Sequence, residues 1–345
     1  MIGTRQLGAY PARRVICRRH IIKIGYFLSC EEYGPADLLD QARWAQEAGF
    51  ESLWISDHFH PWNDEQGESP FVWSMIGAVS QVCSLPISTA VTCPTIRTHP
   101  AIVAHAAATS AVLNESGFLL GVGSGEALNE HVTGARWPDI AVRLEMLEEA
   151  VDVMRELWRG GFVDHHGKHY TVENARLYTL PEQEIPVYVS AFGPKAAALA
   201  GRIGDGFITT SPDEEMIATF RDAGGGNKPV QAGYKVCWGN DDEACIEVAH
   251  RTWANSGLPG ELSQVLPSPR HFEQASTLVT KESTRDSIAY GDDLDRHVDA
   301  FRPFAEAGID VVHISQMGGG EPQTSAKGFF EFYGDKVLPR LRELA

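Results

Sequence analysis

Residues 53–62 read LWISDHFHPW, and this stretch decides the predicted fold. It begins with apolar residues, and an acid, an imidazole and an aromatic cluster follow directly. A buried parallel strand that ends in a functional loop has this pattern, because such strands are apolar on both faces and binding residues collect on loops. Residues 118–130, FLLGVGSGEALNE, show the same pattern: an apolar strand is followed by glycines and then by the carboxylate of Glu126. We therefore expect His58 and Glu126 to face each other across one pocket.

The same alternation of apolar strands and amphipathic helices runs through the chain. The predicted strands cover residues 21–27, 51–56, 87–93, 118–122, 187–191, 206–209, 230–238 and 311–315. The predicted helices cover residues 35–48, 71–83, 100–113, 142–158, 214–221, 241–255, 293–307 and 325–343, and a further helix is predicted to begin at Gly193 and Pro194. Eight strands alternating with helices in one sweep predict an α/β protein, specifically a (β/α)8 TIM barrel with insertions. A doubly wound sheet is the competing fold, but the first strand ends in residues 29–32, SCEE, without the glycine fingerprint of that fold.

Three segments fall outside the repeating pattern. Residues 1–20 form a basic N-terminal arm, expected to be disordered, and the arm has no apolar stretch of the kind that a secretory signal needs. Residues 162–178 are predicted to form a hairpin that turns at residues 166–167. Residues near 256–292 are predicted to form an insertion with helical pieces and no strand. Residues 21–345 are accordingly expected to be a single TIM-barrel domain.

Composition limits the classes of partner. The 345 residues carry a formal net charge of −17, and a protein whose main partner is a nucleic acid or an acidic membrane needs a basic surface instead. No run of about 18 apolar residues is present, so no membrane span is expected. Six scattered cysteines without a CxxC motif are typical of reduced thiols in a cytoplasmic protein. A small-molecule substrate fits this composition best.

In a TIM barrel the active site lies at the carboxyl ends of the strands. Neighbouring strands lie ~4.8 Å apart, so the ends of two strands separated by a third are roughly 10 Å apart. A flat cofactor ring and a small substrate would then fit between His58 and Glu126. An imidazole and a carboxylate in one pocket can serve as acid and base. Several chemically useful side chains follow strand ends in this way: Glu31, Asp57, His58, Trp62, Cys93, Glu126 and Asn129.

Structural explanations compete with these assignments. A single histidine is more often structural than catalytic. His58 and His60 could be a metal pair, but no third ligand stands at a zinc-like spacing, so no metal is predicted. Residues 123–125, GSG, could simply make a tight turn. Residues 165–166, two adjacent histidines, are interpreted as a solvated turn.

Three segments together resemble one protein family: SDHFHPW at 56–62, GVGSGEALNE at 121–130 and AGRIGDGF at 200–207. They are similar to the luciferase-like family of oxidoreductases that use the deazaflavin coenzyme F420, in particular its glucose-6-phosphate dehydrogenase branch. The likeness runs from Ile21 to the C-terminus and is loose through residues 241–300. The resemblance implies hydride transfer between the deazaflavin C5 and an alcohol or carbonyl substrate. A flavin mononucleotide monooxygenase is the alternative, and a cofactor carrier without turnover is a third hypothesis.

The resemblance also implies roles for single residues. His58 would exchange a proton with the substrate hydroxyl, and Glu126 with the ring nitrogen of the deazaflavin. A cis peptide bond between Ala90 and Val91 is implied behind the cofactor ring, and the family forms homodimers. The implied cofactor-binding residues are Asp57, Ala90, Val91, Cys93, Ser124, Gly125 and Asn129, with Phe192, Gly193, Lys195 and Ala196 at the phosphate end. The implied substrate-binding residues are Glu31, Trp62 and Thr210.

One departure from the family pattern concerns the substrate. The sugar-phosphate dehydrogenases bind the phosphate with a threonine, two lysines and an arginine. The threonine matches Thr210, but the cations match Asp213 and, less securely, Ser263 and Ser287. We therefore expect glucose 6-phosphate to be a poor substrate, and an uncharged alcohol, aldehyde or ketone to bind over Trp62.

Overall fold

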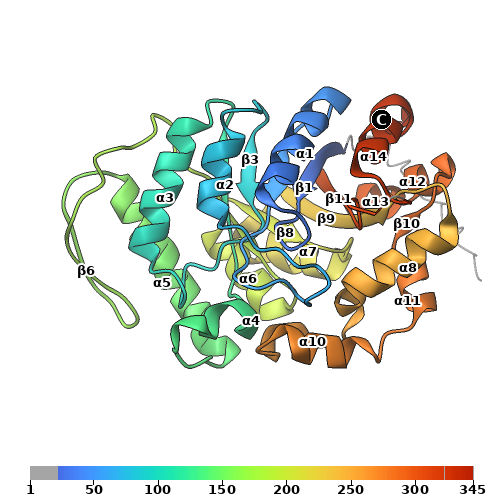
Figure 1. Cartoon of the computed structure of the whole chain (residues 1–345). Coiled ribbons are helices and arrows are strands. Elements are labelled where there is room, and N and C mark those ends of the chain that lie inside the picture. Colours follow the sequence, from blue (N-terminus) through green and yellow to red (C-terminus); the bar gives the residue numbers. More distant parts are fainter. Residues whose placement is uncertain (1–21, 322, 345) are drawn as a thin grey trace, which may run out of the picture.

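A computed structural model describes residues 22–321 and 323–344, and the predicted arm at 1–20 lies outside this part. Parallel strands pair in sequence order from β1 to β11, and β8 pairs with β9 to close the barrel (Figure 1). The predicted (β/α)8 TIM barrel is thereby confirmed. The barrel strands are β1 (Lys23–Leu28), β2 (Leu53–Ile55), β3 (Ile87–Thr89), β4 (Phe118–Val122), β7 (Val187–Ser190), β8 (Gly206–Thr209), β9 (Val230–Cys237) and β11 (Val311–Gln316).

Helices surround this barrel, and local sequence signals set several of their ends. Three of them have proline in their first turn, where a missing N–H costs nothing, and α1 ends at Gly49 with a φ of 90°. The surrounding helices are α1 (Pro35–Ala48), α2 (Val72–Val79), α3 (Pro100–Leu113), α5 (Ile140–Trp158), α6 (Pro194–Ile203), α7 (Glu214–Phe220), α8 (Asp242–Trp253) and α14 (Ala326–Phe332). No described helix is long and apolar enough to cross a membrane.

The lower part of the barrel interior is filled by side chains, as in other barrels of this size. The Trp54 ring stacks on His313 at a centroid distance of 4.2 Å, and its Nε1–H donates to Gln231 Oε1 at 2.9 Å. Gly233 faces this indole, where an added Cβ would lie 3.1 Å from the ring. The barrel interior below the carboxyl ends of the strands is therefore closely packed.

Four predicted elements differ from the structure. Strand β3 stops at Thr89 instead of 93, and beyond it only Thr92 pairs again, in a single parallel bridge to Val122 of β4. The predicted helix 293–307 is split into α12 (Leu294–Asp299) and α13 (Arg302–Glu306), and Pro303 lies in the first turn of the second piece. The predicted helix 325–343 contains a π-helical turn, Tyr333–Val337, between α14 and α15 (Leu338–Leu344).

The insertion is the fourth difference. Its helices are α9 (Leu262–Val265), α10 (Pro269–Ser276) and α11 (Lys281–Ser287), preceded by a 3-10 turn, Ala254–Gly257. The prediction of no strand was wrong, since β10 (Ala289–Tyr290) pairs in parallel with β9. Two residues are too short to give a periodic signal in sequence.

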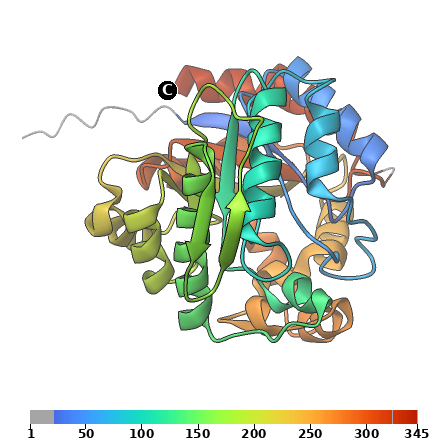
Figure 2. The same cartoon turned by 90° about the vertical axis from the view of Figure 1, so that its left-hand side faces the viewer.

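The predicted hairpin is present as β5 (Val163–His166) and β6 (Thr171–Ala175), and it lies outside the barrel beside α5 (Figure 2). His165 was wrongly assigned to a solvated turn. It is half-buried, and its Nε2 lies 3.2 Å from Glu149 Oε1 on α5. The same carboxylate accepts backbone N–H groups of His169 and Tyr170, so α5 fixes the turn.

Candidate active site

The carboxyl ends of three strands bring one imidazole against two carboxylates. Glu31 follows β1, His58 follows β2, and Glu126 follows β4. His58 Nε2 lies 3.4 Å from Glu31 Oε1 and 3.5 Å from Glu126 Oε1. The expected gap between His58 and Glu126 was wrong, because the ~10 Å spacing applies to the strands and the two side chains reach across it. His58 and the two carboxylates therefore form one cluster at this end of the barrel, which we call the His58 centre.

Asn129, on the short helix α4 (Ala127–Glu130), fixes the geometry of this centre. Its Oδ1 accepts from the backbone N–H groups of Phe59 and His60 at 2.8 and 3.0 Å. Its Nδ2 donates to Glu126 Oε1 at 2.6 Å and faces His58 Nδ1 at 3.0 Å. Two accepted N–H groups settle which end of the amide is oxygen. Asn129 thus joins the β2 loop to the β4 loop.

His58 Nδ1 has two partners that favour opposite tautomers. The Asn129 amide at 3.0 Å favours Nδ1 as acceptor, which leaves the proton on Nε2. The carbonyl oxygen of His60 at 3.1 Å accepts a proton from Nδ1, which frees Nε2 as a base. Both tautomers are accommodated, so the imidazole can act as acid or as base at Nε2.

Glu31 is held as a buried, ionised carboxylate. Its Oε2 accepts hydrogen bonds from Ser29 Oγ at 3.0 Å and from Ser56 Oγ at 2.6 Å. Burial alone would raise the pKa of Glu31, but the contact with His58 and the hydrogen bond from Ser56 outweigh it, and the pKa is lowered. A negative charge beside Nε2 stabilises a protonated His58.

Trp62 covers one side of His58. The two ring centroids are 4.9 Å apart, and the ring of Phe272, in the insertion, lies 5.0 Å from the Trp62 ring centre. His60 turns away, with its Nδ1 3.0 Å from the carbonyl oxygen of Leu128. Among the described residues, no group of three or more His, Cys, Asp or Glu side chains is arranged so that it could hold a metal ion.

Asp57 lies beneath this centre and is already paired. Its Oδ2 accepts from Thr92 Oγ1 at 2.8 Å, and its Oδ1 lies 2.8 Å from Arg97 Nη2. Arg97 also faces Glu130, which accepts the Arg97 backbone N–H at 2.8 Å. Burial raises the pKa of Glu130 to about 7 despite the neighbouring guanidinium. Sequence analysis assigned no role to Arg97, or to Glu130, although Glu130 ends the quoted segment 121–130.

The β4 loop packs closely against the end of β3. Gly125 has a φ of 75°, and an added Cβ there would lie 2.6 Å from Cys93 Sγ, so only glycine fits. Burial raises the pKa of the Cys93 thiol, whose Sγ lies 2.9 Å from Thr95 Oγ1. This cysteine is therefore a packing residue in the thiol form. The loop is also held by Arg143, which donates to the carbonyl oxygen of Gly125 at 2.9 Å and was missed from sequence.

The predicted cis peptide bond between Ala90 and Val91 is confirmed. Both residues are half-buried and pack on a small apolar cluster inside the barrel. They form an apolar wall inside the barrel, and Val91 lies close to Gly123 of the β4 loop. The cluster contains Trp54, Tyr188 and Ile208.

The end of β7 and the start of α6 form an open surface. Phe192 is 65% exposed, and Lys195 is exposed beside it. A Cβ added at Gly193 would meet nothing within 4 Å, and no side chain caps the helix. Ala196 is half-buried in the first turn. Free backbone N–H groups and a nearby ammonium favour an anion at this position.

Of the residues matched to a sugar-phosphate pocket, Asp213 has a structural role in this chain. Thr210 is exposed beyond β8, and Asp213 caps α7 by accepting the N–H groups of Glu215 and Met216 at 3.0 Å each. Ser263 lies in α9, and Ser287 is exposed at the end of α11.

Lys281 and Arg285 are cations close in sequence to Ser287, and they could have supplied the missing positive charge. Both are instead paired with carboxylates of α8. Arg285 Nη2 lies 2.6 Å from Glu243, and Lys281 pairs with Glu247.

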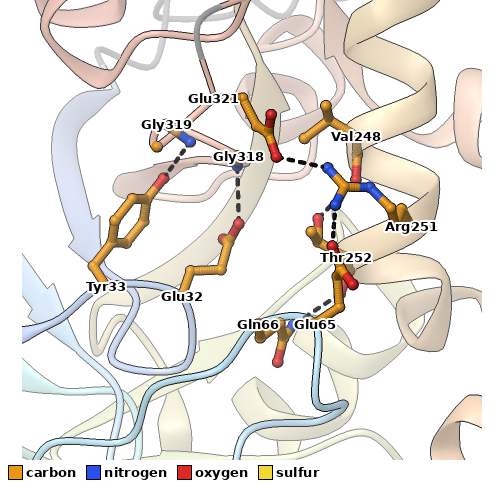
Figure 3. A pocket seen from close by; sticks show the side chains of 11 residues that line it. Glu32, Tyr33, Glu65, Gln66, Val248, Arg251, Thr252, Gly318, Gly319 and Glu321 are labelled. Carbon is orange, nitrogen blue, oxygen red and sulfur yellow. Dashed lines mark hydrogen bonds and ion pairs between the residues drawn. The ribbon is translucent and has the colours of Figure 1, made fainter.

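A separate polar cavity of about 260 Å³ opens at the same end of the barrel (Figure 3). Glu32 Oε1 accepts from the Gly318 N–H at 2.8 Å, and its Oε2 accepts from Trp253 Nε1–H at 2.6 Å. Arg251 spans the opening between Glu65 and Glu321. Each charged side chain that lines the cavity already has a partner. These contacts hold the loops after β1 and β11 together, so we assign no ligand to the cavity. Sequence analysis missed it.

Lys235 lies between the cavity and the catalytic cluster. Its Nζ is 4.0 Å from the centre of the Trp253 ring. Burial lowers the pKa of Lys235, and the nearby Glu31 and Glu32 oppose that shift. Its positive charge partly balances the two buried carboxylates.

The chain was compared with known proteins. A family model described as luciferase-like monooxygenase matches residues 22–311. An F420-dependent glucose-6-phosphate dehydrogenase of Amycolatopsis mediterranei (strain U-32) is 36% identical over 338 residues, covering 94% of this chain and 100% of the relative. A second one, from Rhodococcus jostii (strain RHA1), is 37% identical over 340 residues, with coverages of 94% and 100%.

A solved structure extends the comparison to geometry. An F420-dependent secondary alcohol dehydrogenase, in complex with an F420-acetone adduct, superposes with a TM-score of 0.85 at 32% identity. The match covers 93% of this chain and 99% of that one. The family model and the relatives agree over nearly the whole described barrel. The chain therefore belongs to the luciferase-like family of F420-dependent oxidoreductases.

Proposed function

We propose that this chain is an F420-dependent oxidoreductase that transfers a hydride between the deazaflavin C5 and an alcohol or carbonyl carbon. The observation that carries the proposal is the placement of His58 Nε2 within 3.5 Å of both Glu31 and Glu126 at the catalytic end of the barrel. A carrier without turnover would not require this paired proton chemistry. A flavin mononucleotide monooxygenase is the alternative, and the similarity to F420-dependent relatives argues against it.

The residues present fit a flat cofactor with an anionic tail. The apolar wall at Ala90 and Val91 and the close-packed Gly125 leave a smooth surface beside Glu126. The uncapped start of α6, with Lys195, suits the phosphate end. We assign Ser124, Asn129, Phe192, Gly193 and Ala196 to the same site. Asp57 is assigned with one change: its carboxylate is occupied by Thr92 and Arg97, so it acts by fixing the β2 loop.

When bound, the deazaflavin accepts or donates the hydride at C5, and that chemistry is the cofactor's own. His58 removes the hydroxyl proton at Nε2 during oxidation and returns a proton during reduction. Ionised Glu31, 3.4 Å from Nε2, would offset the positive charge of the imidazole once it holds the proton. Glu126, held by Asn129 Nδ2 at 2.6 Å, exchanges a proton with the ring nitrogen. Trp62 provides an aromatic surface for the substrate carbon chain.

We infer that the substrate is uncharged. Three positions that carry cations in the sugar-phosphate branch are Asp213, Ser263 and Ser287 in this chain. Lys281 and Arg285 are engaged on α8 and do not replace them. Thr210 remains a candidate substrate contact at the rim. A small secondary alcohol or ketone over Trp62 satisfies the site without a phosphate pocket. A homodimer and a cytoplasmic location are part of the same proposal.

Fluorescence titration tests the cofactor assignment. F420 should bind with quenching of its fluorescence, and flavin mononucleotide should not compete. Steady-state turnover of a panel of alcohols and ketones then tests the reaction class. Tight flavin mononucleotide binding without F420 binding would favour the monooxygenase alternative. F420 binding without turnover of any alcohol or carbonyl would leave the carrier hypothesis.

A further inference from the structure

We propose that the insertion holds the two catalytic loops in register through two side-chain contacts, Phe272 with Trp62 and Gln264 with Arg143. We call these the clamp contacts. One joins the insertion to the β2 loop that carries His58, and the other joins it to the β4 loop that carries Glu126. Gln264 and Phe272 are thereby positioning residues for the reaction. The inference deepens the proposed function and rests on it for its kinetic part.

The first clamp contact reaches His58 through one ring. Phe272 on α10 is fully buried, and its ring meets the Trp62 indole edge-on at 5.0 Å and 79°. The centre of the same Trp62 ring lies 4.9 Å from the centre of the His58 ring. Edge-to-face pairs are directional, so the orientation of Phe272 restricts the indole and, through it, the imidazole. The Asp64 N–H, which donates to Glu273 Oε1 at 3.1 Å, adds a polar contact between the same loop and α10.

The second clamp contact reaches the backbone beside Glu126. Arg143 is buried at the start of α5, with its guanidinium 4.2 Å from the centre of the Trp137 ring. Its Nη1 donates to the carbonyl oxygens of Ser124 and Gly125, at 3.4 and 2.9 Å. Its Nη2 donates to Gln264 Oε1 on α9 at 3.2 Å. A buried guanidinium has a rigid fork, so a change at one branch alters the aim of the other.

The two clamp contacts act on the β2 and β4 loops, whose side chains must keep a fixed position relative to each other. β2 and β4 are separated by β3, and the loops meet through the 3.5 Å approach of His58 to Glu126 and through Asn129. Helix α9 also contacts α4, which carries Asn129. Figure 1 shows α4 and α10 at the same end of the molecule. A displacement of about 1 Å in such a centre can reduce the rate by about 10²-fold.

Two variants test the clamp, each with a matched control. Gln264→Ala removes the acceptor from Arg143, and Phe272→Leu removes the aromatic edge from Trp62. Gln274→Ala makes the same chemical change at an exposed position of α10, and Phe162→Leu makes it at a residue 66% exposed beside the hairpin. Hydrogen exchange of the protein without cofactor is the first measurement. We expect faster exchange at residues 122–131 in Gln264→Ala and at residues 56–66 in Phe272→Leu, and no change in the controls.

Binding and kinetic measurements distinguish the two clamp contacts. Gln264→Ala should weaken F420 binding about three- to tenfold, because the Ser124–Gly125 backbone shifts. Phe272→Leu should leave the F420 dissociation constant within about twofold and lower kcat/KM about tenfold, a loss of the size expected for a modest misalignment. A Gln264→Lys variant cannot accept from Arg143 and should behave like Gln264→Ala. Gln264→Glu keeps an oxygen that accepts from Arg143, so its F420 dissociation constant should be close to that of the wild type.

The outcomes distinguish the clamp from the proposed function. If the wild-type protein binds no F420 but the exchange pattern changes as stated, the proposed function is wrong and the clamp stands as a structural device. If the wild type turns over alcohols and both variants match their controls in exchange and kinetics, the clamp is overturned. Faster exchange spread evenly over the whole barrel would also overturn it, since that indicates general destabilisation.

Discussion

His58 is the residue on which two carboxylates and one amide converge, and its removal gives the first prediction. His58→Ala and Glu126→Gln should each leave F420 binding largely intact and lower kcat by ~10²–10⁴-fold, the usual contribution of one general acid or base. Glu126→Gln keeps an oxygen for Asn129 Nδ2, so its effect isolates the lost proton exchange. Stopped-flow reduction of F420 by the alcohol measures the chemical step. A His58→Ala variant that works at the wild-type rate across the pH range would remove His58 from the mechanism.

Glu32 gives a prediction about stability and pH. Burial raises the pKa of this carboxyl from 4.5 to about 7, with hydrogen bonds from Gly318 and Trp253 opposing the shift. The folded protein therefore holds this proton between pH 4.5 and 7 while the unfolded chain has lost it. The contribution of Glu32 to the free energy of unfolding is fully present below pH 4.5 and falls as the pH rises through about 7. Glu32→Gln removes this dependence.

Urea unfolding of wild type and Glu32→Gln at pH 5 and pH 8 measures the contribution of Glu32 to the free energy of unfolding. The variant loses one hydrogen bond at both pH values, because an amide nitrogen faces Trp253 Nε1–H, and that cost does not vary with pH. The difference in stability between Glu32→Gln and wild type should therefore become more favourable to the variant on going from pH 5 to pH 8. Glu130, whose pKa is also raised to about 7, is unchanged in both proteins and cancels. Parallel stability curves for the two proteins would contradict the assignment.

At the scale of residues, the sequence predicted what lies in motifs and missed what depends on burial. His58, Glu126, Asn129 and Glu31 were predicted because each follows an apolar strand. Their partners were not predictable in the same way. Arg97 and Arg143 look like surface cations in sequence, and their roles depend on the distant residues Asp57 and Gly125 that the barrel places against them. The distance between His58 and Glu126 was wrong because strand spacing says nothing about side-chain reach.

At the scale of elements, Asp213 links the start of α7 to substrate choice. Its carboxylate accepts from two backbone N–H groups of the first turn. Asp213→Ala should lower the free energy of unfolding by about 1 kcal/mol, the usual cost of a lost N-cap, and Asp213→Asn should be nearly neutral. Thermal unfolding at low salt compares the three proteins. An Asp213→Ala variant as stable as Asp213→Asn would mean that the capping interaction contributes nothing.

The elements themselves were largely predictable, because apolar strands and helices bounded by proline and glycine carry strong local signals. The exceptions have local physical causes. β3 ends at Thr89 because, of residues 90–93, only Thr92 makes a further β-bridge, to Val122 of β4. β10 contains two residues and owes its strand conformation to β9 alone. The insertion was identified as irregular from sequence, yet its contacts with Trp62 and Arg143 came only from the structure.

At the scale of the whole molecule, the catalytic centre is assembled from parts far apart in the chain. The barrel supplies Glu31, His58 and Glu126 from three strand ends, and the insertion near the C-terminus packs on the loops that carry two of them. A rigid parallel barrel fixes the strand ends, and loops and insertions adapt the site to a substrate. Differences in substrate among relatives are therefore expected in the insertion and at α7, where this chain departs from the sugar-phosphate pattern.

The last prediction concerns the charge of the substrate and of the whole protein. The chain carries a formal net charge of −17, and Asp213 is the residue that we match to a lysine of the sugar-phosphate branch. Two unit charges 4 Å apart interact by about 4 kcal/mol at an effective dielectric of 20, so reversing one sign turns attraction into strong repulsion. With saturating F420, kcat/KM for glucose 6-phosphate should fall well below that for neutral secondary alcohols and ketones.

Ionic strength provides an independent check on the cause. Salt screens charges over about 10 Å at 0.1 M, so the residual activity with glucose 6-phosphate should rise between 10 and 200 mM salt, while that with a neutral alcohol should stay constant. Asp213→Asn should raise activity with glucose 6-phosphate and leave the neutral alcohol unchanged, because the cap on α7 is kept. Efficient oxidation of glucose 6-phosphate by the wild type, at a kcat/KM of ~10⁴ M⁻¹s⁻¹ or better, would show that other cations rebuild the phosphate pocket.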